Sequence, residues 1–311
     1  MMNNRTLYKP FLERHRLTEA YLEQAEQRFA PLIDDVLAQL AVESKNVPKQ
    51  ALVIGINGCQ GSGKSTLADY ICTTLVLVHN IETISVSLDD YYLTKSERLV
   101  LAEQIHPLLS TRGVPGTHDV SLAVKQLSKL VEQSTEQVQL PRFDKSRDDR
   151  DEENPQIVEQ PIQVIILEGW CLGAEPQTLE QLATPINALE SEHDSSGEWR
   201  QFVNQSLTHY AELFALVDCW AMLKAPSFDC VYQWRLEQEQ KMSARLGVDF
   251  NSRDLSEYPD IMSSKELQHF IHHYQRITEH GLNTLPQKMH HLYELDQQRK
   301  IIRYSQPMAM K

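Results

Sequence analysis

The sequence has 311 residues, of which 41% are hydrophobic and 23% charged, an ordinary composition for a globular protein with a sizeable core. Its formal net charge of −13 argues against a nucleic-acid partner, because that role usually needs a basic face. No apolar run approaches the length of a membrane span, and the amino-terminal stretch lacks the apolar centre of a signal peptide, so we expect no membrane partner.

The first segment of the chain is expected to be helical. Across residues 11–43, apolar residues recur every three or four positions, and Pro31 is expected to divide two helices. The polar residues 44–50 are typical of a linker. Residues 1–45 therefore form a helical extension, which either covers the main domain or binds a partner.

The remainder of the chain alternates apolar runs with helical patterns. The runs expected to form strands are 51–56, 82–88, 162–168, 216–223 and 288–296. The stretches expected to form helices are 64–78, 118–134, 199–215, 227–246 and 264–281. A polar loop is expected at 191–198. This alternation predicts an α/β fold with a five-stranded parallel sheet and helices on both faces.

A glycine-rich motif follows the first predicted strand. Residues Gly58 to Ser65 match the G-x-x-x-x-G-K-S phosphate loop, in which backbone N–H groups surround phosphate oxygens. Lys64 would reach the β- and γ-phosphates, and the Ser65 hydroxyl would bind Mg²⁺. An accidental match is disfavoured because strand, loop and helix follow in the required order. The motif predicts a P-loop NTPase fold, with ATP and Mg²⁺ as cofactors and these nucleotide-binding residues: Gly58, Cys59, Gln60, Gly61, Ser62, Gly63, Lys64, Ser65 and Thr66.

Acidic residues follow two other predicted strands. Asp89 and Asp90 end the second strand, and Glu168 ends the third. Ligands of open α/β sheets lie beyond the carboxyl ends of the strands. A carboxylate there can orient an alcohol and accept its proton, and another can organise Mg²⁺. A single such residue is more often a helix cap, but two acids beside a phosphate loop favour catalysis.

Two loops supply candidate contacts for an anionic small-molecule acceptor. The first, 111–119, contains Arg112, His118 and Asp119. The second, 140–150, is rich in cations and contains Arg142, Asp144 and Lys145. Bidentate arginine suits a carboxylate or phosphate. The alternative for the second loop is a surface segment that pairs with the acidic residues 148–153; for Arg142 and Lys145 we favour binding.

The amphipathic stretch 229–247 is a candidate lid. Arg235 lies between Trp234 and Leu236 and could offset transition-state charge on the phosphates. Lys241 and Arg245 fit a plain surface helix equally well.

The histidines at 269, 272 and 273 have metal-ligand spacing without a supporting carboxylate pattern, so a structural role is favoured. Cys59 is interpreted as a tolerated small side chain. The five cysteines include no Cys-x-x-Cys pair, which suits a reducing, cytoplasmic compartment.

Several motifs in register resemble one known family. The segments GCQGSGKST, DDYYLT, RGVPGTHD, LPRFDKS, LEGWCLG, FVNQSLTHY and VYQWRLEQE are similar, in this order, to those of D-glycerate 3-kinases of the plant and fungal type. That group belongs to the superfamily of pantothenate kinase, uridine kinase and phosphoribulokinase. The resemblance covers about residues 50 to 296. A departure is KSRDDR, which lacks the glycine that follows DKS in the plant-type enzymes.

The resemblance implies an ATP-dependent kinase that phosphorylates a hydroxyl group, with D-glycerate as candidate acceptor and 3-phosphoglycerate as product. It implies that Asp89 is the base, that Glu168 lies near the metal and that Arg142, Asp144 and Lys145 lie near the acceptor. Residues 46–311 are then the P-loop kinase domain, with a lid helix around 227–247.

The alternative is an ATP-binding regulatory protein with little catalysis. A GTPase is disfavoured, since the sequence has no N-K-x-D element. The predicted site residues are Lys64, Asp89 and Arg235 for catalysis, Ser65 and Glu168 for Mg²⁺, and Asp89, Tyr91, Arg112, His118, Arg142, Asp144 and Lys145 for the acceptor.

Overall fold

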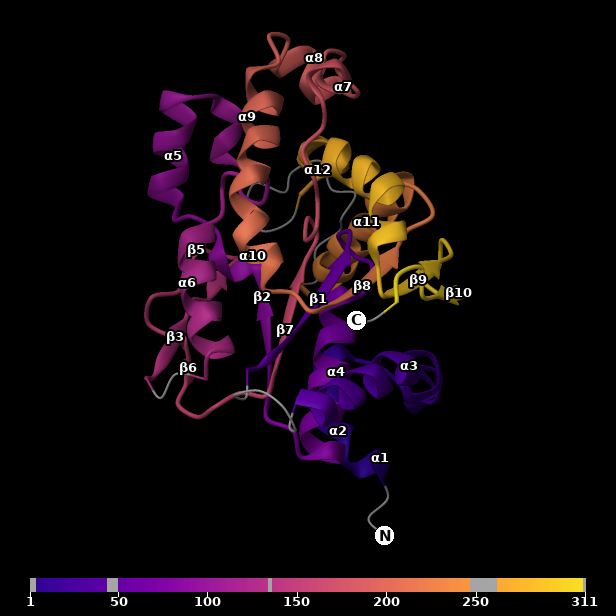
Figure 1. The fold of residues 1–311 in the computed structure, drawn as a ribbon. Coiled ribbons are helices and arrows are strands. Elements are labelled where there is room, and N and C mark those ends of the chain that lie inside the picture. Colours follow the sequence, from indigo (N-terminus) through magenta and orange to yellow (C-terminus); the bar gives the residue numbers. More distant parts are fainter. Residues whose placement is uncertain (1–3, 44–49, 134–135, 247–261, 310–311) are drawn as a thin grey trace.

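A central sheet of six strands organises the chain in the computed structural model, which describes residues 4–43, 50–133, 136–246 and 262–309 (Figure 1). Its strand order is β10-β9-β8-β1-β7-β2. The strands are β1 (Leu52–Gly58), β2 (Thr83–Ser87), β7 (Val164–Gly169), β8 (Cys219–Lys224), β9 (His291–Leu295) and β10 (Ile301–Ser305). The first five are parallel to one another, and β10 is antiparallel to its neighbour β9.

The α/β class and the five predicted strands are confirmed, and the structure adds β10. This sixth strand is short, partly exposed and joined to β9 by a tight turn. Ile302 on β10 is 66% exposed, so the strand lacks the buried apolar run that revealed the others. It occupies one edge of the sheet.

Helices cover both faces of the sheet and form two cores. On β1, Ile54 and Ile56 belong to one core and Val53 to the other, because successive side chains of a strand point to opposite faces. The first core includes α4 (Lys64–His79) and α11 (Asp229–Leu246), and the second includes α6 (Val120–Val131) and α12 (Ser264–Thr284). Four shorter helices connect these elements: η1 (Leu88–Tyr91), α5 (Lys95–Gln104), η2 (Pro107–Ser110) and η4 (Pro286–Lys288).

The amino-terminal helices are α1 (Asn4–Leu7), α2 (Lys9–His15) and α3 (Glu19–Glu43), and they pack into the first core. The expectation that Pro31 divides two helices is wrong, because Pro31 lies inside α3. Its missing N–H deprives the exposed Gln27 of a partner for its carbonyl, which water can replace. Burial of Phe29 and Leu32 on either side of the proline favours one continuous helix. The expected linker at 44–50 lies outside the described residues except for Gln50.

Two small antiparallel pairs shape the segment between α6 and β7. Strand β3 (Val138–Leu140) pairs with β6 (Gln156–Val158), and β4 (Phe143–Asp144) pairs with β5 (Asp149–Arg150). The predicted cationic loop 140–150 is therefore a short hairpin that projects beyond β3 and β6. This hairpin carries Lys145 at its turn.

A helical insertion lies between β7 and β8. It comprises α7 (Leu179–Leu182), α8 (Ala188–His193), α9 (Glu198–Ser206), η3 (Leu207–Tyr210) and α10 (Ala211–Ala215). The polar loop expected at 191–198 is only partly a loop, since its first three residues end α8 and Asp194 is buried. Asp194 caps α9 through the Trp199 and Arg200 amides and pairs with the Arg200 guanidinium at 2.9 Å. Asp194 is the buried polar residue of this segment, and the other polar side chains there are exposed.

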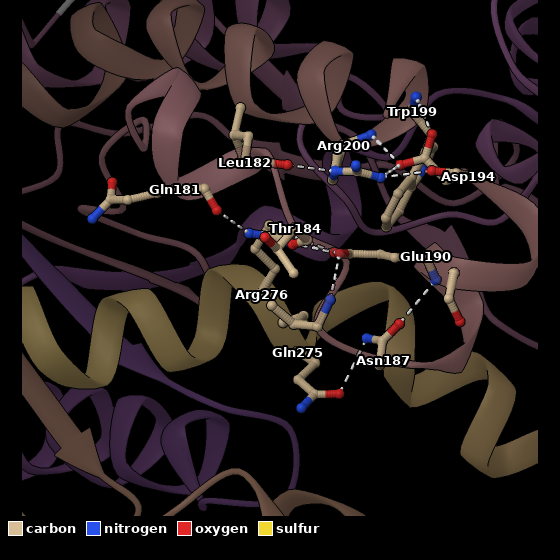
Figure 2. A network of polar contacts seen from close by, with 12 residues as sticks. Gln181, Leu182, Thr184, Asn187, Glu190, Asp194, Trp199, Arg200, Gln275 and Arg276 are labelled. Atoms are coloured by element: carbon tan, nitrogen blue, oxygen red, sulfur yellow. Dashed lines mark hydrogen bonds and ion pairs between the residues drawn. The ribbon is translucent and has the colours of Figure 1, made fainter. Parts of the chain in front are cut away.

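A buried ion pair fastens this insertion to α12 (Figure 2). The Arg276 guanidinium donates to both carboxylate oxygens of Glu190, at 2.7 and 2.6 Å, and to the carbonyls of Gln181 and Thr184. Glu190 is fully buried. Removing either partner of such a pair leaves an uncompensated buried charge. The pair therefore fixes the position of α12, whose Tyr274 lies two residues from Arg276.

Candidate active site

The phosphate loop connects the end of β1 to the start of α4. Gly61 and Gly63 have φ of 79° and 96°, a region that favours glycine. A Cβ atom on Gly61 would lie 2.7 Å from the Cβ of Trp234, whereas one on Gly63 would meet nothing within 4 Å. Residue 61 is thus closely packed, while the backbone at residue 63 faces open space where a phosphate could approach.

Lys64, Ser65 and Glu168 form one polar cluster at the ends of β1 and β7. The Ser65 hydroxyl donates to Oε1 of Glu168 at 2.9 Å, and Nζ of Lys64 lies 3.6 Å from Oε2. Burial lowers the pKa of Lys64, but the nearby carboxylates of Glu168 and Asp89 outweigh it, and the net pKa is raised. Lys64 is therefore a cation at neutral pH.

The same cluster fits Mg²⁺. Oε2 of Glu168 is buried and accepts no hydrogen bond from the described residues. A hydroxyl and a carboxylate are oxygen ligands of the kind that Mg²⁺ prefers. Ser65 and Glu168 are thus the side chains that would hold the ion or its waters.

Asp89 lies in η1, directly after β2. Its carboxylate accepts a hydrogen bond from Nζ of Lys145 at 2.8 Å and from the Tyr92 hydroxyl at 2.7 Å. Burial raises the pKa of Asp89, but the cations of Lys145 and Lys64 outweigh that effect and hold the pKa below its ordinary value. Asp89 is therefore a carboxylate at neutral pH, bound on two sides.

The neighbouring Asp90 anchors the hairpin that delivers Lys145. Its carboxylate accepts from the backbone N–H of Phe143 at 3.1 Å and from the Arg142 guanidinium at 3.2 Å. The two adjacent aspartates thus have different partners. Asp89 contacts the tip of the hairpin through Lys145, and Asp90 contacts its base.

Lys64, Ser65, Asp89 and Lys145 border a cavity of about 260 Å³, which we call the acceptor cavity because three residues predicted from the sequence to bind the acceptor, Asp89, Arg112 and Lys145, line it. It is lined by Gln60, Gly61, Gly63, Lys64, Ser65, Thr66, Asp89, Tyr92, Arg112, Lys145, Trp170, Arg235, Gln238, Phe270 and Tyr274. Among the predicted catalytic and acceptor-binding residues, the structure brings Lys64, Asp89, Arg112, Lys145 and Arg235 together here. Four of these five are cationic, although the protein as a whole is acidic.

Arg112 is held in place by its surroundings. Its guanidinium pairs with Asp148 and lies 5.4 Å from the ring centre of Phe143. The Tyr274 hydroxyl donates to the Arg112 carbonyl at 2.8 Å. The adjacent Gly113 has a φ of 106°, and a Cβ there would lie 2.8 Å from that hydroxyl. A glycine is needed at residue 113 for both reasons.

Four predicted acceptor-binding residues do not line the acceptor cavity. Tyr91 is fully buried, and Asp144 accepts from Ser146 within the hairpin. Arg142 is exposed and bonds to Asp90 and Gln156. His118 lies behind Tyr92, with ring centres 4.8 Å apart, and bonds to the Tyr210 hydroxyl at 2.7 Å. Burial lowers the pKa of His118 to about 4, so it is neutral at pH 7.

The remaining predictions concern α11, Cys59 and the histidines. Arg235 pairs with Glu239 at 2.5 Å and reaches the acceptor cavity from α11; the side chain of Arg245 lies outside the described part of the chain. Cys59 is buried, which raises its pKa to about 12 and disfavours a reactive thiolate. Within the described residues there is no cluster of His, Cys, Asp and Glu suited to a metal.

Some cavity residues were missed by sequence reasoning. Tyr92 could have been found, because a short helix at 88–91 brings residue 92 back to Asp89. Trp170 follows Glu168 by two residues and donates to the Gly113 carbonyl at 2.9 Å. No local pattern marks the others, which reach the cavity from α11 and α12: Gln238, Phe270 and Tyr274.

The fold and site together define a P-loop kinase, with a phosphate loop after the first strand and carboxylates at the ends of two neighbouring strands. No protein-family model matches the chain. An uncharacterised kinase of Schizosaccharomyces pombe is 33% identical over 267 residues, covering 83% of this chain and 91% of that protein. The chloroplastic D-glycerate 3-kinase of Arabidopsis thaliana is 32% identical over 67% of this chain and 47% of its own length, so the chain spans about half of the plant protein.

A solved structure points to the same family as these relatives. The D-glycerate 3-kinase from Cryptococcus neoformans is 27% identical, with a TM-score of 0.69, over 89% of this chain and 98% of that one. The chain belongs to the D-glycerate 3-kinase-like family of P-loop kinases. It is an ATP-dependent kinase. Within the described residues no helix has the length and apolar character needed to cross a membrane.

Proposed function

We propose that the protein transfers the γ-phosphoryl group of ATP to a hydroxyl of D-glycerate, giving 3-phosphoglycerate. Two relatives bear the name D-glycerate 3-kinase, from Arabidopsis thaliana and Cryptococcus neoformans. The observation that carries the proposal is the acceptor cavity itself. Its volume of about 260 Å³, part of which the phosphates of ATP would fill beside Gly63 and Lys64, leaves room only for an acceptor smaller than the ligands of typical sites of about 300–1,000 Å³. A compact, anionic acceptor suits this size and its cationic lining.

The proposed reaction assigns Asp89 to the acceptor hydroxyl. The carboxylate would orient the hydroxyl and accept its proton as the phosphoryl group is transferred. In the structure Lys145 lies 2.8 Å from this carboxylate. An acceptor carboxylate that binds Lys145 would compete with Asp89 for the cation, which would raise the basicity of Asp89 while the acceptor is bound.

Arg112 is our candidate anchor for the acceptor's carboxylate. The sequence favoured Arg142 for this role, but Arg142 is not part of the cavity lining. Arg112 borders the cavity, and its planar guanidinium suits bidentate binding of a carboxylate. Trp170 and Tyr274 restrict the space beside it.

The donor side of the reaction is assigned to the phosphate loop. Lys64 and the loop backbone would bind the β- and γ-phosphates, and Arg235 would approach the transferring group from α11. Mg²⁺, held by Ser65 and Glu168, would neutralise phosphate charge. Helix α11 is then the lid of the site.

A steady-state assay of the purified protein tests this function. Mg-ATP is supplied with D-glycerate, L-glycerate, pantothenate or uridine, and ADP formation is measured. The proposal predicts turnover with D-glycerate and not with uridine, and 3-phosphoglycerate as product by mass spectrometry. Turnover with another acceptor alone would refute glycerate as substrate. ATP binding with only background turnover for every acceptor would favour the regulatory alternative.

A further inference from the structure

A single carboxylate joins two arginines at the turn of the hairpin formed by β4 and β5. Asp148 accepts a hydrogen bond from Nη1 of Arg112 through Oδ1, and its Oδ2 lies 3.0 Å from Nη2 of Arg98. Arg112 lines the acceptor cavity, whereas Arg98 lies on α5 and does not line it. Asp148 therefore connects a residue of the cavity to one outside it. Neither Asp148 nor Arg98 was among the residues predicted from the sequence to form the site.

Arg98 is the fixed point of this arrangement. It is only 1% exposed, and its guanidinium donates to the carbonyls of Leu93, Ser110 and Asp148, at 3.3, 3.0 and 2.7 Å. Among the described residues, Asp148 supplies the one carboxylate that pairs with it. A buried cation that loses its carboxylate is left uncompensated, at a large cost in stability. Asp148 is therefore held at Arg98.

The backbone of Asp148 lies in the left-handed region, with a φ of 52°. This conformation is unfavourable for a residue with a Cβ atom, and it persists only where the surroundings fix it. Glycine adopts it freely. An aspartate at this position indicates that its side chain stabilises the turn by more than the backbone strain costs. The two arginines are the contacts that supply this stabilisation.

Arg112 is the partner whose position matters for the acceptor. Its guanidinium lies 5.4 Å from the ring centre of Phe143, and among the described residues Asp148 is the one acceptor of its guanidinium N–H groups. The Nε and Nη2 groups are thus left for a ligand in the cavity. A long side chain that its ligand must immobilise loses rotamer freedom, which weakens binding. Contact with Asp148 restricts Arg112 before the acceptor arrives.

We propose that Asp148, fixed by Arg98, is a positioning residue that holds Arg112 ready for the acceptor's carboxylate. The inference rests on the proposed function in so far as the acceptor carries a carboxylate that binds Arg112. The charge of Asp148 acts in the opposite direction, because a carboxylate beside Arg112 repels an anionic acceptor. Two substitutions of Asp148 separate the positioning effect from the charge effect.

The test compares Asp148→Asn with Asp148→Gly. The asparagine variant removes the charge, keeps an amide oxygen that can accept from Arg112, and tolerates a positive φ. The glycine variant removes the charge and the contact with Arg112 together. Its backbone takes the same φ without strain and keeps the carbonyl that accepts from Arg98. Steady-state assays of both variants and of the unsubstituted protein measure kcat and the KM values for D-glycerate and ATP.

We expect the KM for D-glycerate to be roughly three- to tenfold higher in Asp148→Gly than in Asp148→Asn, the range for one immobilised side chain. In the same comparison, kcat and the KM for ATP should agree within about twofold, because residue 148 contacts neither Asp89 nor the phosphate loop. Equal KM values for D-glycerate in the two variants would overturn the inference. A matching change in kcat and in the KM for ATP would also overturn it, since a general disturbance of the fold moves all three.

Asp149→Ala controls for a loosened hairpin. The Asp149 carboxylate accepts from the backbone N–H of Lys95 at 3.0 Å, which ties the hairpin to α5 without a hydrogen bond to Arg98 or Arg112. We expect this variant to keep the KM for D-glycerate within about twofold of the unsubstituted protein. A rise as large as that of Asp148→Gly would assign the effect to the hairpin and overturn the inference. The double variant Arg98→Met/Asp148→Gly removes the buried cation with its partner, and it replaces Asp148→Gly in the comparison if that variant does not fold.

The two proposals can fail separately. Glycerate kinase activity with equal KM values in the two variants of Asp148 would leave the proposed function standing and remove the positioning role. Turnover of L-glycerate or pantothenate in place of D-glycerate, with the expected difference in its own KM, would do the reverse, because both carry a carboxylate. Turnover of uridine alone, or of no acceptor, would overturn both.

Discussion

Replacing Asp89 by asparagine tests the centre of the proposed mechanism. The substitution keeps the shape of the side chain and removes its charge and its capacity to accept a proton. General base catalysis contributes roughly 10²- to 10⁴-fold to rates. Because Lys145 and Lys64 lower the pKa of Asp89, the carboxylate is a weak base. We therefore expect kcat to fall by roughly 10²- to 10³-fold, the lower part of that range, or about 3–4 kcal/mol in transition-state stabilisation.

ATP binding should survive this change. Lys64 loses one neighbouring carboxylate but keeps Glu168 at 3.6 Å. The site becomes more positive, which does not oppose a polyphosphate anion. We expect the KM for ATP to stay within about threefold. A large fall in kcat with an unchanged KM for ATP assigns the interaction to the transition state.

The matched control is Asp90→Asn. Asp90 is the adjacent residue of the same type, and it anchors the hairpin through the Phe143 amide without lining the acceptor cavity. We expect its kcat to stay within about tenfold of the unsubstituted protein, since the chemistry is untouched. Both variants are assayed under saturating Mg-ATP with the preferred acceptor. If Asp89→Asn kept kcat within threefold, or if Asp90→Asn lost as much, Asp89 would not be the base.

Three further predictions concern charge and burial. Lys145→Met removes a cation that lowers the pKa of Asp89, while burial still raises that pKa. The acid limb of the kcat–pH profile should therefore move to higher pH. An acid limb at the same pH would show that Lys145 does not lower the pKa of Asp89. Arg276→Met leaves the buried Glu190 unpaired and should lower the free energy of unfolding by about 3–5 kcal/mol in urea titrations, and adding Glu190→Leu should restore part of the loss. His118 has a folded pKa of about 4 against an ordinary 6.5, so the unfolded chain binds more protons between those values and stability falls on acidification. From pH 7 to 5 this one group should contribute a loss of about 2 kcal/mol, and His118→Phe should show a correspondingly smaller loss in the same titration.

The sequence by itself determined the class of fold and the residues of the proposed donor half of the site. Local patterns sufficed there: the glycine spacing of a phosphate loop, alternating apolar runs and helices, and acidic residues at strand ends, with Asp89 just after β2 and Glu168 as the next-to-last residue of β7. These features are contiguous, so their geometry follows from backbone preferences and from the meeting of parallel strand ends at one edge of the sheet.

Tertiary structure alone decided which residues form the proposed acceptor half of the site and how the amino-terminal helices pack. Between the adjacent cations of one hairpin, it directed Lys145 into the acceptor cavity and Arg142 to Asp90. It kept α3 unbroken at Pro31, because burial on both flanks of the proline outweighs one lost hydrogen bond. It also brought Tyr274 to the site from α12. Contacts between segments far apart in the chain depend on packing and on buried partners, and no local pattern of residues records them.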